Sequence, residues 1–226
     1  MKIKWLGHSC FIIEGNDRII VDPYINGNPV CPEKVEDIEV DIIAITHAHG
    51  DHFGDAIEIA KNNGAKIVAI YEIVEYASQY GIEGEAINMG GGVKVGKGTE
   101  ITMVPAFHSS GFTMANFKFG GAMPAGLIIK SGKTIYHAGD TSIFSDMKLI
   151  GELYKPDVAL LPIGGRYTMD ARQAALAAEW IKAEVTIPMH YNTWDAIKQD
   201  PKEFKRMAEE RGAKVVILNP GEEIEI

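Results

Sequence analysis

Three histidines and one aspartate lie within the six residues His47-Ala48-His49-Gly50-Asp51-His52. They directly follow the apolar run 41–45, and a loop after a buried strand can aim several imidazoles at one point. Imidazole and carboxylate donors without thiolate suit zinc, manganese or iron. A solvated loop that happens to be rich in histidine is the alternative, but it does not explain where the other histidines and aspartates fall. The segment therefore predicts a metal site.

Three further polar residues follow apolar runs that we expect to be strands. His108 comes after residues 102–104, Asp140 after residues 135–136, and His190 after residues 187–189. Ligands at the carboxyl ends of strands converge above a sheet. We therefore expect these three side chains to join the histidine-rich segment in one site.

The series Thr46-His47-Ala48-His49-Gly50-Asp51-His52, His108, Gly139-Asp140-Thr141 and His190 resembles the metallo-β-lactamase superfamily in order and spacing, over nearly the whole chain. The resemblance implies two divalent metal ions, zinc in the first place, with manganese or iron as alternatives. It assigns one ion to His47, His49 and His108, the other to Asp51, His52 and His190, and both to a bridging Asp140.

Four other segments resemble, more narrowly, a family of metal-dependent hydrolases that is similar to lactonases acting on sugar-acid phosphates. They are Trp5-Leu6-Gly7-His8-Ser9-Cys10, Val21-Asp22-Pro23, Tyr167-Thr168-Met169-Asp170 and Pro188-Met189-His190-Tyr191-Asn192-Thr193. Two cations about 3.5–4 Å apart can share a water and lower its pKa toward neutrality, so that a bridging hydroxide attacks a carbonyl or phosphorus centre. We expect Asp51 both to bind metal and to orient this hydroxide. The resemblance says more about fold and metal than about substrate.

Five residues outside the ligand set are also candidates. Asp22 is a turn residue that, by the resemblance, accepts a hydrogen bond from a motif histidine and fixes its tautomer. His8 and His137 lie on or beside predicted strands, which favours hydrogen-bonded core histidines or supports of the ligands over substrate contacts. Arg166 and Thr168 stand just before a predicted helix, where a helix N-terminus beside an arginine could anchor an anionic substrate. Ordinary N-capping also explains the Thr168-Met169-Asp170 segment.

Composition limits the partners. The formal net charge is −9, and the 22 Lys and Arg residues are scattered, which argues against nucleic acid as a partner. Bound cations could still attract a small anionic substrate. Two cysteines without C-x-x-C spacing form no disulfide framework. No apolar stretch approaches the roughly 20 residues that span a bilayer, so we expect no membrane partner and a cytoplasmic location. A homo-oligomer is left open.

Apolar runs and turn residues predict alternating strands and helices in one domain over residues 1–226. The expected fold is an α/β (α+β) four-layer sandwich, with two mixed β-sheets face to face and helices outside. The region 109–125 has no clear period and is a loop or lid candidate. Strands are expected at 3–6, 10–13, 19–21, 41–45, 66–70, 86–89, 93–95, 100–104, 126–129, 134–137, 158–162, 185–188 and 215–218, and helices at 55–61, 72–79, 145–154, 171–182 and 201–211.

The favoured activity is hydrolysis of a small ester, lactone or phosphoester. One alternative is a mononuclear-iron redox enzyme of the persulfide dioxygenase type, which the ligand count does not rule out. Another is a nuclease or RNA-processing enzyme of the same superfamily, against which the acidic balance counts. A third is a binding protein that kept the fold, for which we would expect a lost ligand; none of the seven is missing.

Overall fold

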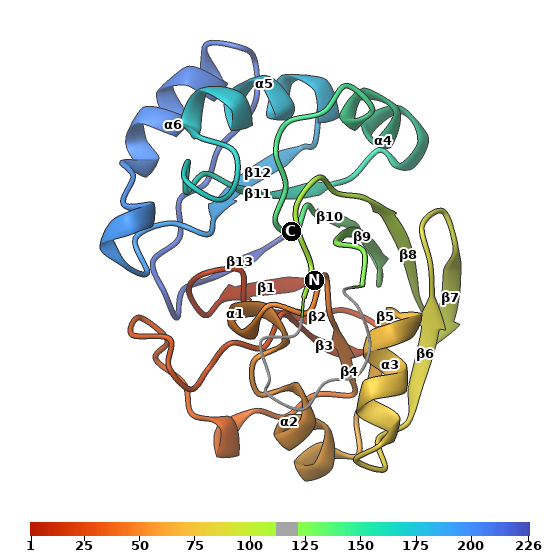
Figure 1. Cartoon of the computed structure of the whole chain (residues 1–226). Coiled ribbons are helices and arrows are strands. Elements are labelled where there is room, and N and C mark those ends of the chain that lie inside the picture. The colour runs from red at the N-terminus through yellow and green to blue at the C-terminus, as the bar shows by residue number, and fades with distance from the viewer. Residues whose placement is uncertain (112–121) are drawn as a thin grey trace.

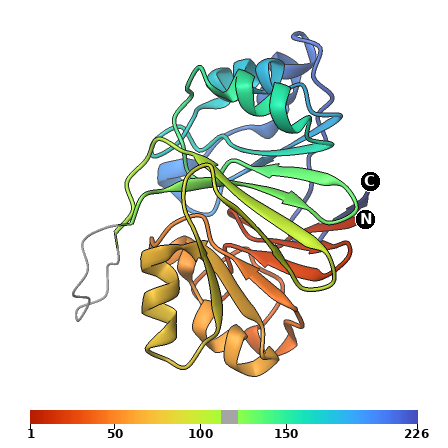
Figure 2. The same cartoon turned by 90° about the vertical axis from the view of Figure 1, so that its right-hand side faces the viewer.

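Two mixed β-sheets lie face to face, and helices cover the outer side of each (Figures 1 and 2). The computed structural model describes residues 1–111 and 122–226. Most of the predicted loop 109–125 therefore lies outside the described residues. The four layers agree with the sandwich predicted from the sequence.

The first sheet contains seven strands in the order β13-β1-β2-β3-β4-β5-β6. β13, β1, β2 and β3 pair antiparallel, and β3 to β6 pair parallel. The strands are β1 (Lys2–Trp5), β2 (Phe11–Glu14), β3 (Arg18–Val21), β4 (Ile42–Ala44), β5 (Lys66–Ile70), β6 (Gly84–Ile87) and β13 (Glu223–Glu225).

The second sheet contains six strands in the order β12-β11-β10-β9-β8-β7. β7 to β10 pair antiparallel, and β10, β11 and β12 pair parallel. The strands are β7 (Gly92–Val95), β8 (Thr99–Pro105), β9 (Ala125–Lys130), β10 (Thr134–His137), β11 (Val158–Pro162) and β12 (Val185–Met189).

The helices divide between the two sheets. Figure 1 shows α2 (Ala56–Asn63) and α3 (Tyr71–Ser78) over the first sheet, and α4 (Met147–Tyr154), α5 (Ala171–Ile181) and α6 (Pro201–Glu209) over the second. α1 (Gly50–Phe53) is one short turn after β4, and two 3-10 helices cover Val35–Asp37 and Asp195–Ile197. None of the helices that the described residues form combines the length and apolar character needed to cross a membrane.

The core lies between the sheets and under the helices. Consecutive residues of the central strands are buried, as in the Ile19, Ile20 and Val21 run of β3 and the Ile42, Ile43 and Ala44 run of β4. Strands that alternate with covering helices bury both faces, which explains why their sequences are continuously apolar. This rigid core fixes the ends of the strands that carry the polar residues.

Three local predictions differ from the structure. The histidine-rich segment was expected to be a loop, yet its second half forms α1. The final strand β13 was not predicted, because its Glu-Ile-Glu sequence is short and mostly charged. The expected strand 215–218 forms only one bridge, between Val215 and Thr186 of β12, although Val215 and Leu218 are buried.

Candidate metal centre

The histidine-rich motif bends where α1 begins, and the bend divides its side chains into two groups. His49 has extended backbone, with φ −62° and ψ 149°, and its carbonyl accepts from the amide of Phe53 in the first turn of the helix. His47 and His49 belong to one group of potential metal donors and Asp51 and His52 to another, while His47 and His52 also form a third group with Asp140. One short segment thus contributes to two neighbouring clusters.

The first cluster consists of His47, His49 and His108, whose donor atoms all lie within 4.8 Å of one another. His108 follows β8 and reaches the motif from the second sheet. Burial lowers the pKa of all three imidazoles. Lowered pKa values favour the neutral imidazole, the form whose nitrogen lone pair can bind a metal ion.

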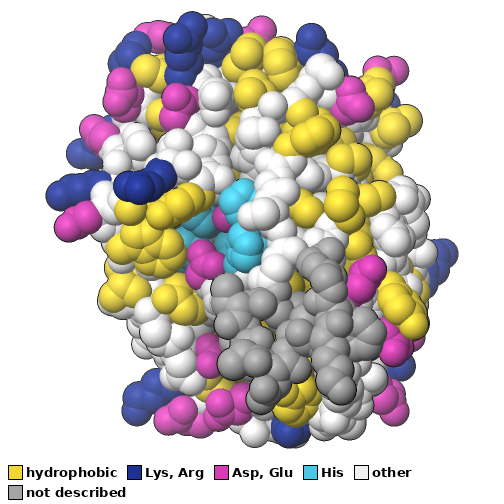
Figure 3. All heavy atoms as spheres, viewed as in Figure 1, with side chains coloured by type: hydrophobic (Ala, Val, Ile, Leu, Met, Phe, Trp, Pro, Cys, Tyr) yellow, Lys and Arg dark blue, Asp and Glu magenta, His cyan; other side chains and the backbone are white. Residues whose placement is uncertain are grey.

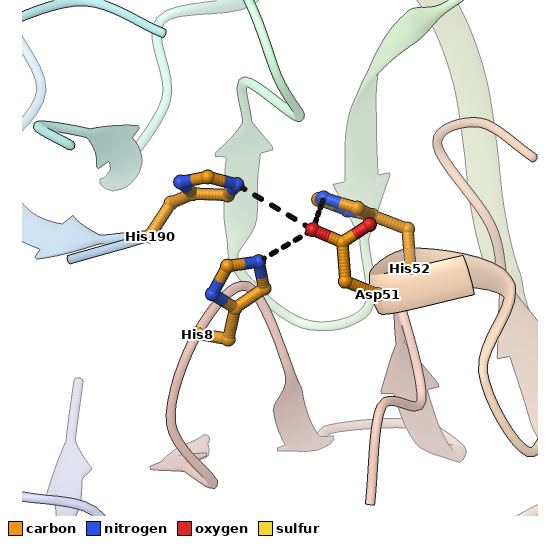
Figure 4. Close-up of side chains that lie close together, drawn as sticks. All are labelled: His8, Asp51, His52 and His190. Carbon is orange, nitrogen blue, oxygen red and sulfur yellow. Dashed lines mark hydrogen bonds and ion pairs between the residues drawn. The ribbon is translucent and has the colours of Figure 1, made fainter. Parts of the chain in front are cut away.

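The second cluster consists of His8, Asp51, His52 and His190. Figure 4 shows the three imidazoles pointing toward one carboxylate oxygen, Oδ2 of Asp51. The distances to this oxygen are 3.1 Å from Nε2 of His8, 3.8 Å from Nε2 of His52 and 4.0 Å from Nε2 of His190. Four donors thus surround one point at the junction of the two sheets.

Asp140 lies between the clusters. One carboxylate oxygen is 3.3 Å from Nε2 of His52, and the other is 3.0 Å from Nε2 of His190 and 3.5 Å from Nε2 of His108. Asp140 follows Gly139, whose φ is +61° and where a Cβ would lie 2.5 Å from the carbonyl oxygen of Ala125. The glycine allows the chain to turn sharply after β10 and direct the carboxylate inward.

Electrostatics at the centre favour a cation. Burial opposes the charges on Asp51 and Asp140, but neighbouring histidines lower the pKa of both carboxyls below the usual range. Burial also opposes positive charge on His52, yet Asp140 and Asp22 raise the pKa of its imidazole well above the usual value. Carboxylates that stabilise positive charge on an imidazole can do the same for a metal ion at this point.

Several buried atoms at the centre have no hydrogen-bond partner among the described residues. They include Nε2 of His52, Nε2 of His190 and Oδ1 of Asp140. An unpaired buried polar atom is costly, so native proteins rarely retain one without a ligand or a functional reason. These atoms belong to the second donor cluster and to Asp140 between the clusters, and a bound cation would satisfy them. The donor set therefore fits a metal ion.

Asp22 lies behind the motif, just after β3, and accepts three hydrogen bonds. Oδ1 accepts from the amide of Thr46 at 2.8 Å, while Oδ2 accepts from the Thr46 hydroxyl at 2.6 Å and lies 2.7 Å from Nδ1 of His52. The hydroxyl oxygen in turn lies 3.0 Å from Nδ1 of His47. Because these Nδ1 atoms have acceptors, the Nε2 atoms of both histidines are left to face the clusters.

The two remaining histidines lie in different environments. Nε2 of His137 lies 2.9 Å from the carbonyl oxygen of Ser9, and Nδ1 accepts from the amide of Gly139 at 3.2 Å. His137 is thus a hydrogen-bonded core residue. His8 belongs instead to the second donor cluster, which sequence reasoning did not foresee. The sequence carried no signal for this position, because the φ of +54° that turns His8 is a property of the folded chain.

Arg166 and Thr168, the predicted substrate anchors, lie outside the donor clusters. The guanidinium of Arg166 is 5.6 Å from the centre of the Tyr167 ring, and the Thr168 hydroxyl is 3.4 Å from the carbonyl oxygen of Met169. Asp170 caps α5 in a capping box with Gln173. Within the described residues, neither candidate anchor forms a hydrogen bond or ion pair with a predicted ligand.

The centre is accessible from outside. Figure 3 shows histidine side chains at the floor of a hollow, with an acidic group among them and hydrophobic side chains along one border. The side chains of Asp51 and His108 are 29% and 14% exposed to solvent, whereas those of His52 and His190 are buried. A small molecule can therefore approach Asp51 while the deeper donors stay shielded from water.

Comparison with known proteins is consistent with this arrangement. A family model described as a beta-lactamase superfamily domain matches residues 2–190. A UPF0173 metal-dependent hydrolase of Nanoarchaeum equitans is 52% identical and one of Thermococcus kodakarensis is 53% identical, each over 100% of both chains. The structure of Igni18, a metallo hydrolase from Ignicoccus hospitalis, superimposes with a TM-score of 0.90 at 44% identity, covering 100% of this chain and 98% of that one. The chain therefore belongs to the UPF0173 family of metal-dependent hydrolases, within the beta-lactamase superfamily.

Proposed function

We propose that this protein is a binuclear metal-dependent hydrolase that cleaves a small ester, lactone or phosphoester. His47, His49 and His108 would hold one ion and Asp51, His52 and His190 the other, with Asp140 shared between them. The observation that supports this most strongly is the position of Asp140, within 3.5 Å of histidines from both clusters. Since β13 pairs with β1, we take residues 1–226 as one hydrolase domain.

Two divalent ions, zinc in the first place, would supply a water of lowered pKa and polarise the substrate oxygen. The residues of the chain would hold and orient the reactants. Asp51 is the donor of the second cluster that is most open to solvent, so its carboxylate can accept a hydrogen bond from the attacking water. Asp22 fixes the tautomer of His52 through Nδ1. The deeper donors keep competing water away from the buried side of the centre.

The substrate is proposed to be small and anionic. The histidines lie at the floor of a hollow, which suits a compact molecule better than a polymer (Figure 3). The overall net charge is −9, but the charge of bound cations would dominate the field inside the hollow. Lactones and phosphodiesters both fit these conditions.

The first test is metal content and activity. Protein purified without chelator is expected to carry two divalent ions per chain and to hydrolyse at least one member of a panel of p-nitrophenyl phosphodiesters, sugar-phosphate lactones and thioesters. His49→Ala and Asp140→Ala are expected to lower both metal content and kcat, the latter by at least about 100-fold. Arg172→Ala, a change at the exposed second residue of α5 and outside the donor clusters, serves as the control.

Two outcomes would contradict the proposal. Unchanged hydrolysis in both variants would place the chemistry elsewhere. A single iron per chain together with thiol-dependent oxygen uptake would instead identify a redox enzyme on the same fold.

A further inference from the structure

His8 lies closer to the shared oxygen of the second cluster than two of the predicted ligands do. Its Nε2 is 3.1 Å from Oδ2 of Asp51, compared with 3.8 Å for His52 and 4.0 Å for His190. All three imidazoles point toward this oxygen from different directions (Figure 4). His8 lies in the turn after β1, near the start of the chain. Of the other two imidazoles, that of His52 belongs to the histidine-rich motif and that of His190 follows β12.

The spacing suits direct coordination. Zinc-like ions bind imidazole nitrogen at about 2.0–2.1 Å and carboxylate oxygen at about 2.0–2.2 Å, so two donors on one ion lie roughly 3–4 Å apart. The donor atoms of His8, Asp51, His52 and His190 all lie within 4.8 Å of one another. An ion among them would therefore be in reach of Nε2 of His8 as well as of the other three donors.

The other ring nitrogen of His8 has the hydrogen-bond partner that a metal-bound histidine needs. Nδ1 lies 2.8 Å from the hydroxyl oxygen of Thr193. A threonine oxygen can accept from an imidazole N–H, which leaves Nε2 with its lone pair toward the cluster. Metal-bound histidines generally have such a partner on their other nitrogen. The ring is fully buried and packs against the rings of His190, at 4.0 Å between centroids, and Trp194, at 4.9 Å.

The backbone of His8 is held as firmly as its ring. Its carbonyl oxygen accepts from the amide of His190 at 2.9 Å and from the indole of Trp5 at 3.0 Å. Its φ of +54° lies in the left-handed region, which is uncommon for residues other than glycine. A metal ligand needs a fixed backbone because its nitrogen must stay at bonding distance from the ion. A residue that only fills the core has no such requirement.

We propose that His8 is itself a metal ligand, through Nε2, so that the second ion has five protein donors: His8, Asp51, His52, His190 and Asp140. This inference rests on the two-metal arrangement proposed above. The competing role is that of a positioning residue, in which Thr193 donates to Nδ1 and Nε2–H donates to Asp51 without touching the metal.

The decisive measurement is a crystal structure of the wild-type protein loaded with Co²⁺ and recorded at the cobalt absorption edge. We expect Nε2 of His8 within about 2.1 Å of the ion in the second cluster, as for the other imidazole ligands. A separation of more than about 3 Å, with Nε2 directed at Asp51 instead, would overturn the inference. This measurement needs no variant, so it does not depend on the folding of one.

Calorimetric titration of metal-free protein with Co²⁺ provides an independent readout. His8→Asn tolerates the left-handed backbone, can still bond Thr193 and is too short to reach the ion. The variant is expected to weaken one of the two binding events by at least about 100-fold. Loss of a residue that only orients a ligand lowers metal affinity by about 10–100-fold. His108→Asn, the matched control in the first cluster, is expected to weaken the other event.

The outcomes separate the two proposals. If the wild-type protein binds fewer than two Co²⁺ per chain, the two-metal function fails and this inference fails with it. If it binds two, but His8→Asn leaves both binding constants unchanged, only the role of His8 is wrong.

Discussion

Asp22 illustrates how a residue that does not face the substrate can govern a metal site. Its two oxygens accept from the amide and hydroxyl of Thr46 and lie against Nδ1 of His52. In Asp22→Asn, one oxygen becomes an NH₂ group that faces at least one donor. We expect metal affinity, measured by titration of the metal-free variant, to fall about 10–100-fold.

Asp55→Asn is the matched control for this change. Asp55 also accepts backbone amides, those of Ile25 and Asn26, but it belongs to neither donor cluster. The variant is expected to lose some stability while keeping its metal affinity. An equal loss of affinity in both variants would mean that Asp22 acts through general stability alone.

The buried histidines make the stability of the metal-free protein depend on pH. Burial lowers the pKa of His8 to about 4 and also lowers the pKa of His137, whereas both titrate near 6.5 when unfolded. Below that pH the unfolded chain takes up protons that the folded chain does not, so the free energy of unfolding falls with pH. His52, whose pKa is raised, contributes stability that is lost only as the pH rises above 6.5.

Chemical unfolding in the presence of chelator measures this dependence. Between pH 7.5 and pH 5.5 we expect His8 alone to account for a decrease of about 1 kcal/mol in the free energy of unfolding. His8→Asn should reduce the slope. A His8→Asn variant with the same pH slope as the wild-type protein would contradict the assignment of His8 as neutral when buried, because the opposing contribution of His52 is common to both proteins.

At the scale of elements, the end of α1 is the point where the motif is most sensitive to a backbone change. Gly54 ends the helix with φ +43°, and a Cβ there would lie 2.3 Å from the carbonyl oxygen of Pro23, the neighbour of Asp22. Gly54→Ala must therefore displace backbone that positions both Asp22 and His52. We expect a loss of about 3 kcal/mol in the free energy of unfolding, measured with chelator present, and weaker metal binding.

Gly64→Ala separates the effect of contact from that of backbone conformation. Gly64 ends α2 with φ +63°, but a Cβ there meets nothing within 4 Å. Its replacement should cost only about 1 kcal/mol and leave metal affinity unchanged. If the two variants lose the same stability, the close approach of Gly54 to Pro23 is not important.

The larger elements could be predicted from the sequence because their local signals agree with their surroundings. β5 (Lys66–Ile70) and β11 (Val158–Pro162) were predicted with the observed bounds, since both are short apolar runs buried on both faces. β13 could not be predicted, because its order comes from pairing with β1 far away in sequence. α1 is too short for a periodic pattern and depends on the turn at His49.

For the candidate site, residue type and strand position predicted which side chains come together, but not all of their contacts. The seven proposed ligands converge in the structure, and their roles as ligands stay predictions. His8 had no such signal, because a lone histidine after a strand resembles a core residue. Its place beside Asp51 depends on Thr193 and Trp194, which the fold brings to it from the second half of the chain.

At the scale of the whole molecule, the donor clusters join the two sheets. His8 and the four donors of the histidine-rich motif follow strands of the first sheet, while His108, Asp140 and His190 follow strands of the second. Bound ions would therefore stabilise the contact between sheets as well as the site itself. With metal at 1000 times the Kd of each site, the expected gain is about 4 kcal/mol per ion and about 8 kcal/mol for two, or about 20 °C in Tm for a chain of this size.

Thermal unfolding with and without EDTA checks this expectation. Chelation should lower the Tm of the wild-type protein by about that amount and have a much smaller effect on Asp140→Asn, in which the shared ligand is impaired. A wild-type Tm that does not respond to EDTA, in protein shown to have lost its metal, would mean that the sheets hold together without help from the ions.

The division of the ligands between the sheets also sets an order of events during synthesis. Domains begin to fold as the chain emerges from the ribosome, N-terminal part first. The histidine-rich motif is made early, His108 and Asp140 follow, and His190 comes after more than four fifths of the chain. A nascent chain can therefore offer an ion only an incomplete set of donors. The second cluster is complete only when β12 is in place, which makes uptake of the second ion a late step in the biogenesis of the enzyme.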